Sequence, residues 1–561
     1  MSSRPEWRRP TMIAAVLGCG ACYHGLDDDG RFASQGGDAT TDDDGASDDG
    51  GPNGVPDDGD LPTLSMSRLT RSRLRHAVGD LFSPALAAAL VLPDDLSVQG
   101  WVAIASRELT PSRGDVAAYE AAAREIAAWA VADDAWRARW GACAGDGTAP
   151  ADCARSIVQA FGLRLFRRPL TDDELERYTA IFELAQQQLP EFWPAFSYPL
   201  TAMVLSPNFT HVIEHGREVG DALALDDYEL AARLSFLLWD TTPDDALLEA
   251  AAAGLGDAAR YEAEIVRMLE DDARIDDGVR AFATDMFDLA LVERARIDPE
   301  RFPELDDAML HSMRAAVAEL AVAMRHDGRE FLAILDAGFA FADPQLAGHY
   351  GQSIAGDQLT RVELGAAQPR VGLLTEPGML TARSSYALTS PTRRGRFIAT
   401  RLLCRDVPDP PPNVPTDLGE PPSGTTRREQ VEQHLERPDC AGCHAAVDPL
   451  GFGLEQFDAI GRVQTQDNGV SIDASGQLDD VVFDDARSLA RALLDHPELR
   501  PCFARQLARY ALGVEIDHEP ALAWIASAFE QAYRDRGGDL VATLADFARS
   551  DAFRFARGLR G

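Results

Sequence analysis

The pentapeptide Cys440-Ala441-Gly442-Cys443-His444 places two thiols and one imidazole within five residues. The spacing C-x-x-C-H is the attachment signature of a c-type haem. Two intervening residues let both sulfurs reach one edge of the porphyrin, and the adjacent imidazole ligates the iron as the proximal ligand. The motif therefore predicts that Cys440 and Cys443 hold haem c covalently and that His444 binds the haem iron.

Two other kinds of site also use paired cysteines. Structural zinc needs four ligands, usually from two half-sites, and the sequence has no second C-x-x-C. A thioredoxin-like dithiol would follow a strand, whereas residues 426–436, which precede the motif, have a helical pattern. Covalent haem is the favoured interpretation, with zinc, thiol redox chemistry and inert cysteines as the alternatives.

The sixth ligand of the iron is not given by the motif. No methionine follows His444, so the usual downstream methionine cannot serve. Met379 precedes the motif and is the preferred sixth ligand, with His496, His518 or an open coordination position as alternatives. A methionine would raise the redox potential relative to a second histidine.

Residues 211–215 match a different metal motif. His211 and His215 frame the pattern H-x-x-E-H, in which two histidines on one helical face bind zinc and a glutamate acts as the base. Pro207 and Gly216 bracket a very short segment, so the end of a capped helix is the favoured interpretation. A zinc hydrolase stays as an alternative.

The arginines of the run Arg393-Arg394-Gly395-Arg396 have two interpretations. Guanidinium groups form bidentate hydrogen bonds to carboxylates, so one of them could bind a haem propionate. The other interpretation is a solvated helix start.

The first 60 residues have the character of an export signal and a tether. Basic residues precede a short apolar stretch, and residues 16–19 (VLGC) resemble a bacterial lipobox, so Cys19 is expected to be lipidated. An ordinary cleaved signal is the alternative. Residues 27–60 contain twelve aspartates and a single base, Arg31, a composition that cannot bury enough apolar surface to fold.

The overall charge restricts the partners. The formal net charge is −38, and all 53 basic residues are arginines. Such a charge disfavours nucleic acid and anionic membrane surfaces. Without lysine, the sequence has no P-loop lysine and no lysine Schiff base. We therefore expect contact with a membrane through a lipid anchor only, and an unidentified redox protein as the partner.

The remaining sequence is mostly helical in pattern. Helices are expected over residues 67–82, 115–131, 154–166 and 228–239, and a strand hairpin within 470–483. Thr171 and Glu174 form a capping box that opens another helix. Cys143 and Cys153 flank one short loop and are expected to pair locally. That pairing leaves Cys404 and Cys502 as partners for each other. Export of the protein permits both disulfides. Four free buried thiols are the alternative.

Several blocks occur in an order that resembles the large secreted proteins with an embedded planctomycete-type cytochrome c block. The blocks are RLTRSRLRHAVGDLF at 68–82, RLFRRPLTDDELERY at 164–178, LSPNFTHVIE at 205–214, LDDYELAARLSFLLWDTTPDDALL at 225–248, FADPQLAGHYG at 341–351, GLLTEPGMLTARSSYALTSPTRRG at 372–395, PDPPPNVP at 408–415, CAGCHAAVDPLGFGLEQFDAIGRVQT at 440–465 and ARQLARYALG at 504–513. The resemblance implies an exported, mostly helical, cytochrome-like protein. It implies no substrate.

These observations predict a mainly α, multidomain helical protein with an embedded c-type cytochrome-like domain and few strands. The expected divisions are a signal with lipobox 1–19, a disordered acidic linker 20–60, helical domains 61–135, 136–222 and 223–360, a cytochrome c-like haem domain 361–466 and a C-terminal helical domain 467–561.

The function expected is that of an exported haem protein in the periplasm or at the cell surface. It would take part in electron transfer or serve as the haem-bearing part of an oxidoreductase, and the sequence assigns no catalytic residue. One alternative is a structural or binding lipoprotein with a degenerate haem block. The other is the zinc hydrolase that uses His211 and His215.

Overall fold

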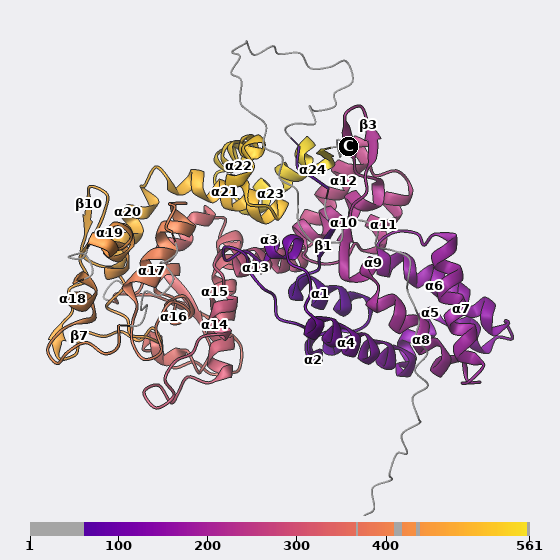
Figure 1. Ribbon diagram of the computed structural model, residues 1–561, viewed down its shortest axis with the longest axis horizontal. Helices are drawn as coiled ribbons and strands as arrows, with labels where there is room; N and C mark the ends of the chain where they lie inside the picture. Colours follow the sequence, from indigo (N-terminus) through magenta and orange to yellow (C-terminus); the bar gives the residue numbers. More distant parts are fainter. Residues whose placement is uncertain (1–60, 65, 366–367, 409–417, 434–437, 558–561) are drawn as a thin grey trace, which may run out of the picture. The chain divides into compact units, whose positions relative to one another are not determined.

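The structure is a computed structural model that describes residues 61–64, 66–365, 368–408, 418–433 and 438–557. This part of the chain is mainly helical and has few, short strands, as the sequence predicts (Figure 1). The expected signal, Cys19 and the acidic linker 20–60 lie outside the described residues. Within the described ranges, no helix is both long and apolar enough to cross a bilayer.

Most of the first helices of the chain share one apolar core that includes Phe161, Phe182 and Phe196, whereas Ala103 and Ile104 are buried in the second core. The elements in this stretch are β1 (Met66–Arg68), α1 (Arg71–Leu81), α2 (Pro84–Ala89), α3 (Val102–Glu108), α4 (Arg113–Ala132), α5 (Asp134–Trp140), the 3-10 turn η2 (Ala142–Gly145), α6 (Pro150–Phe166), α7 (Asp172–Gln186), α8 (Phe192–Leu205), α9 (Pro207–Thr210) and β2 (His211–Ile213). Helix α4 packs on α8. The expected domains 61–135 and 136–222 thus contribute to the same core, and their boundary stays a prediction.

Capping residues set where these helices begin. Thr171 and Glu174 exchange hydrogen bonds with each other's backbone N–H at the start of α7, which confirms the predicted capping box. The helix predicted over 67–82 begins only at Arg71, because the extended Thr70 accepts a hydrogen bond from the Arg73 N–H and caps it there. Residues 66–68 pair with residues 211–213 as strands instead.

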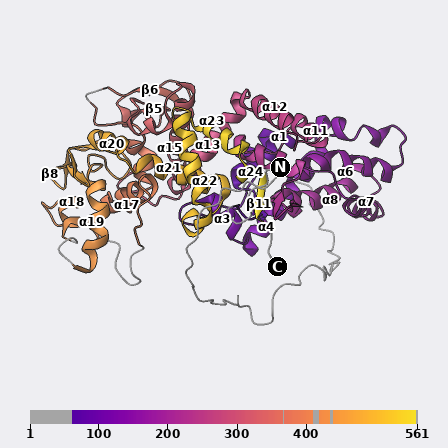
Figure 2. The same cartoon turned by 90° about the horizontal axis from the view of Figure 1, so that it is seen from above.

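A second and larger apolar core follows. Its first part comprises β3 (Arg217–Val219), β4 (Ala222–Ala224), α10 (Asp227–Leu238), α11 (Asp245–Ala252), α12 (Ala258–Leu269), α13 (Asp272–Met286), α14 (Ala290–Glu293), α15 (Asp307–His326), η3 (Phe331–Asp336), β5 (Phe339–Ala342), η4 (Ala347–Tyr350), β6 (Thr360–Glu363), η5 (Leu373–Thr375) and α16 (Pro377–Thr381). Strands β5 and β6 form an antiparallel pair (Figure 2). Helix α10 confirms the apolar helix predicted over 228–239, and its residues Leu234 and Leu238 are buried in this core.

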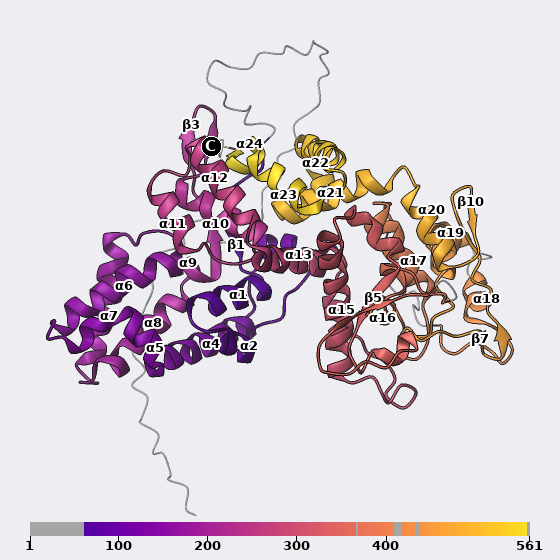
Figure 3. The ribbon, with the colours of Figure 1, turned by 180° about the vertical axis from the view of Figure 1, so that it is seen from behind.

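The last third of the chain completes the same core. Its elements are α17 (Pro391–Phe397), the π-helical turn η6 (Ile398–Leu402), α18 (Arg427–Glu432), α19 (Pro438–Phe452), β7 (Gln466–Asp467), β8 (Val470–Ser471), β9 (Gly476–Leu478), β10 (Val481–Phe483), α20 (Ala486–Leu494), α21 (Leu499–Leu512), η7 (Ile516–His518), η8 (Pro520–Leu522), α22 (Ala523–Asp535), α23 (Leu540–Arg549), α24 (Asp551–Arg554) and β11 (Phe555–Arg557). Helices α17 and α19 pack against each other (Figure 3).

The strands between 466 and 483 form two hairpins in place of the single one predicted within 470–483. Strand β7 pairs with β8, and β9 pairs with β10. Asn468 and Gly469 both have positive φ between β7 and β8, which is the conformation that a two-residue hairpin turn requires. This Asn-Gly pair is the sequence signal for the additional hairpin.

One sheet joins segments that are far apart in the sequence. Strand β4 pairs with β3 on one side and with β11 on the other, and Thr63 forms a parallel bridge with Arg557. The last described strand, β11, therefore lies in the same sheet as β3 and β4, with β4 at its centre.

Both predicted disulfides are present. Cys143 is bonded to Cys153, and Cys404 to Cys502, with Cα separations of 5.5 and 5.3 Å. The second bond joins the chain after η6 to helix α21 across 98 residues of sequence. In the described chain, the cysteines left as thiols are Cys440 and Cys443 of the C-x-x-C-H motif.

Candidate functional site

Helix α19 carries the two free thiols and the adjacent imidazole. Cys440, Cys443 and His444 are spaced i, i+3 and i+4, which places them on one face of a helix. Cys440 is half-buried, Cys443 is exposed and His444 is half-buried. The three groups are thus gathered on about one turn, with the thiols at the solvent boundary.

A buried carboxylate holds the imidazole from the other end of the same turn. His444 Nδ1 lies 2.7 Å from Asp448 Oδ2, and the Asp448 side chain has no exposed surface. The second oxygen, Oδ1, accepts a hydrogen bond of 2.7 Å from the Thr392 hydroxyl of α17. The hydrogen bond to Asp448 raises the pKa of His444, against the opposing effect of burial. Asp448 therefore fixes the orientation of the ring, and Thr392 fixes Asp448.

Close packing of α17 on α19 makes this arrangement possible. A Cβ on Gly395 would overlap the carbonyl oxygen of Val447, and a Cβ on Gly451 would overlap the carbonyl oxygen of Pro391. Glycine at these two positions lets the helix backbones approach closely enough for Thr392 to reach Asp448. Asp448 lies outside the C-x-x-C-H motif from which the site is predicted, and its signal in the sequence is its position four residues after His444.

The arginines of residues 393–396 differ in what they bind. Arg394 is buried and donates hydrogen bonds to the carbonyl oxygens of Leu454, Phe457 and Asp458, at 2.8 to 2.9 Å. It therefore ties α17 to the chain after α19. Arg393 and Arg396 instead line a cavity of about 880 Å³.

The candidate sixth ligands belong to three different segments of the fold. Met379 is buried in α16, where its sulfur lies 3.7 Å from Nη1 of Arg383. His496 is hydrogen-bonded to Asp479, and His518 is exposed in η7. The sixth ligand therefore stays a prediction.

The H-x-x-E-H segment does not have the geometry of a zinc protease helix. His211 ends the short helix α9 and begins strand β2, as the interpretation of a capped helix end predicts. Glu214 is buried and bound by Arg233 through two hydrogen bonds of 2.7 and 2.6 Å, so it is held in an ion pair. Burial lowers the pKa of His211 to about 4, while His215 is exposed.

The donors on α19 fit a covalent haem. Two free thiols with two residues between them match the attachment pattern. An imidazole whose Nδ1 faces a carboxylate matches the usual arrangement of a metal-ligating histidine, in which the other nitrogen, Nε2, faces the metal. Among the described residues, no three His, Cys, Asp or Glu side chains are arranged to hold a metal ion.

Four family models match successive segments of the chain. They are PSD3, protein of unknown function (DUF1587), at residues 67–132; PSD5 (DUF1595) at 153–214; PSD4 (DUF1592) at 225–352; and PSCyt3 (DUF1588) at 370–467. These models support the resemblance to the planctomycete-type cytochrome c proteins. Neither the curated proteins nor the solved structures contain a match.

Proposed function

We propose that this chain, four segments of which match families of the planctomycete-type cytochrome c group, is an exported haem protein that transfers electrons. Cys440 and Cys443 would hold haem c through thioethers, and His444 would ligate its iron. When bound, the haem supplies a one-electron redox centre. The observation that carries the proposal is the hydrogen bond between His444 and the buried Asp448.

Asp448 is the residue of this chain that would tune the site. A carboxylate that accepts the Nδ1 proton fixes the tautomer of the imidazole and makes Nε2 a more basic ligand. A more basic ligand stabilises the oxidised metal and lowers the potential. Met379 is proposed as the sixth ligand, with His496, His518 or an open position as alternatives.

The location proposed for the protein is the periplasm or the cell surface, attached through a lipid on Cys19. The composition supports this location, because a net charge of −38 suits a protein that works in an ionic medium away from nucleic acid. A redox protein is the partner that the proposed electron transfer requires.

The test is to express the chain in a host with cytochrome c maturation, denature it and stain for haem. We expect the stain in the wild type, none in the Cys440→Ala/Cys443→Ala double variant, and retention in a Cys143→Ser/Cys153→Ser control. His444→Ala should keep covalent haem but change its spectrum. An unstained wild-type protein would contradict the proposal, and a binding lipoprotein without haem would then be the better description.

A further inference from the structure

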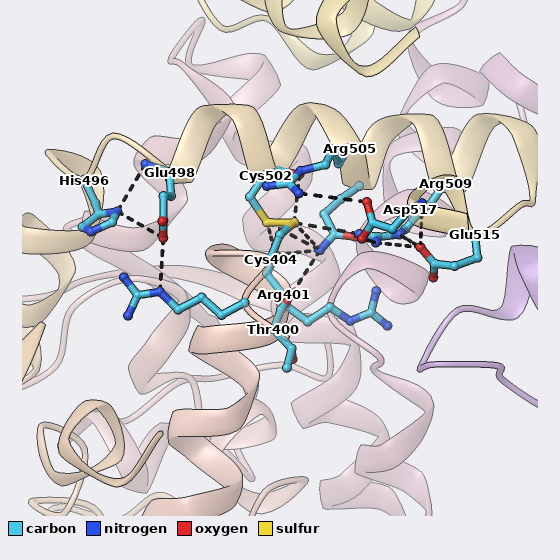
Figure 4. Close-up of a disulfide and its surroundings, with 12 residues drawn as sticks. Thr400, Arg401, Cys404, His496, Glu498, Cys502, Arg505, Arg509, Glu515 and Asp517 are labelled. Carbon is cyan, nitrogen blue, oxygen red and sulfur yellow. Dashed lines mark hydrogen bonds and ion pairs between the residues drawn. A yellow bond between two sulfur atoms is a disulfide. The ribbon is translucent and has the colours of Figure 1, made fainter. Parts of the chain in front are cut away.

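A cavity of about 880 Å³ lies beside α17 and η6. Four segments form its walls: residues 99–101, residues around Asp288, the stretch from Ala382 to Pro408, and residues 506–518. The Cys404–Cys502 disulfide joins two of these walls (Figure 4). The cavity is therefore formed by tertiary contacts, and its most distant wall segments are about 400 residues apart in sequence.

Arg401 is a buried, charged residue in the wall of this cavity. The side chain is 7% exposed, and in the described part of the chain neither Nη1 nor Nη2 has a hydrogen-bond partner. Figure 4 shows the guanidinium extended away from the disulfide, while the backbone oxygen of Arg401 accepts a hydrogen bond from Gln506. A buried donor left without an acceptor costs free energy, more so when it is charged.

The guanidinium of Arg401 is also held in place. Its Cζ lies 4.3 Å from the centre of the Trp101 ring, and a Cβ at Gly100 would overlap Nη2. Burial lowers the pKa of Arg401 to about 10, against the opposing effect of Asp285 and Asp288. The group thus stays charged at neutral pH, with its donors fixed in position before any ligand arrives.

Two other arginines of the cavity donate hydrogen bonds to backbone carbonyl oxygens. Arg383 donates to Phe287 O at 2.7 Å, and Arg393 donates to Ser384 O at 2.7 Å. A carbonyl satisfies the donor but leaves the charge in place. The lining has six arginines and four acidic residues, Asp288, Asp406, Glu515 and Asp517, and the last two are bound to Arg509. The cavity therefore concentrates positive charge in a chain whose net charge is −38.

We propose that this cavity binds a small ligand with two or more anionic oxygens, such as a sulfate, a phosphate or a polycarboxylate. The planar donors of Arg401 match two such oxygens. The proposal does not depend on haem. Pro391, Thr392 and Gly395 face α19, whereas Arg393, Arg396 and Phe397 line the cavity. The cavity and the C-x-x-C-H motif therefore lie on different faces of α17.

The test is calorimetric titration of the purified protein with inorganic sulfate, pyrophosphate and citrate in about 0.15 M sodium chloride, where exposed charges are largely screened. We expect binding of at least one anion, weakened roughly tenfold or more in Arg401→Gln, since bonds to charged groups are the strong ones. Arg401→Lys should be intermediate, because it keeps the charge but loses the planar fork.

Two further variants keep the result interpretable. Arg393→Gln removes an exposed cavity arginine, so it should fold normally and weaken binding about threefold, even where Arg401→Gln fails to fold. Arg534→Gln makes the same charge change on α22, at a side chain that is 61% exposed and not part of the cavity lining. It should bind like the wild type.

Three outcomes would overturn the proposal. The first is no binding of any of the three anions. The second is equal weakening in Arg534→Gln and Arg401→Gln, which would indicate an effect of overall charge. The third is binding by haem-free protein but not by haem-loaded protein, which would assign the arginines to the haem propionates, the other source of anionic oxygen.

Discussion

Buried charges on the two sides of the continuous segment α17–η6 differ in how they are paired. On the face toward α19, the buried Asp448 carboxylate has its partners within the chain, His444 and Thr392. On the face toward the cavity, the Nη groups of Arg401 have no hydrogen-bond partner in the described chain. A buried charge that is matched internally serves to orient its partner. A buried guanidinium whose donors have no acceptor in the protein can instead bind the oxygens of a ligand.

The two sites also differ in how they are built. A single helix, α19, carries all four residues of the candidate haem site: Cys440, Cys443, His444 and Asp448. The cavity needs four segments and a disulfide. Changes that disturb long-range packing should therefore affect the cavity more than the haem site.

Removal of the long-range disulfide should give the largest separation of the two sites. The Cys404→Ser/Cys502→Ser variant should lose about 4 kcal/mol in the free energy of unfolding, since the bond closes a loop of about a hundred residues. Anion binding should be lost and covalent haem should be retained. Urea denaturation, anion titration and haem staining measure the three. The Cys143–Cys153 bond closes a much shorter loop. Its removal in Cys143→Ser/Cys153→Ser should therefore lower the free energy of unfolding by less and leave both sites intact. Loss of haem with anion binding kept would reverse the comparison.

A change on the α17–α19 contact should affect both sites together. Gly395→Ala would bring its Cβ into the Val447 carbonyl, so we expect a loss of about 2 to 3 kcal/mol from overpacking. Gly442→Ala is the matched control, because no heavy atom lies within 4 Å of its Cβ site. That control should stabilise α19 by about 0.5 kcal/mol, since alanine is the better helix former. Equal unfolding curves for the two variants would show that the helices do not pack this closely.

A change at Asp448 should alter the potential and leave attachment unaffected. Asp448→Asn keeps the shape but removes the carboxylate from His444, so the midpoint potential should rise by about 60 mV, a tenfold change in relative affinity. Redox titration measures the shift. Asp473→Asn, an exposed aspartate in the same part of the chain, should leave the potential unchanged. A stained Asp448→Asn protein with the wild-type potential would argue against a positioning role for Asp448.

The smallest effect is expected at Asp288, on the cavity side. Burial raises the pKa of Asp288, against the opposing effect of Arg383 and Arg401. Once ionised, its carboxylate competes with a bound anion, so wild-type affinity should fall as the pH rises through this raised pKa. Asp288→Asn should bind the anion about threefold more tightly at neutral pH and reduce that pH dependence, with the remainder due to Asp285, whose pKa burial raises to about 6. Calorimetric titration with sulfate at several pH values measures both profiles, and a variant profile as steep as that of the wild type would assign the pH dependence to another group.

The features that the sequence predicted correctly are those with local signals. The capping box of Thr171 and Glu174, the helices over 115–131 and 154–166, and the Cys143–Cys153 bond each depend on residues close together in the chain. The Cys404–Cys502 bond was predicted only because the other cysteines had been assigned. The C-x-x-C-H motif is local in the same sense, and its haem stays a proposal.

The features that the sequence did not predict depend on packing. Asp448 stands four residues after His444, but its burial comes from the close approach of α17 at Gly395. Arg401 has no pattern that separates it from the other arginines, and its surroundings at Trp101 and Gly100 are 300 residues away in sequence. Residues 67 and 68 fall within the predicted helix 67–82 but pair with β2, because Thr70 caps the helix and it begins only at Arg71.

The sheet of β3, β4 and β11 has a consequence for synthesis. Strand β11 follows β4 by about 330 residues, so one edge of β4 stays unpaired while the intervening chain is made. At about 5 to 20 residues per second, that interval lasts roughly 15 to 65 seconds. An unpaired edge is a template for wrong pairing between chains. Strand β4 is only three residues long, Ala222–Ala224. The unpaired edge is therefore short, which limits wrong pairing during this interval.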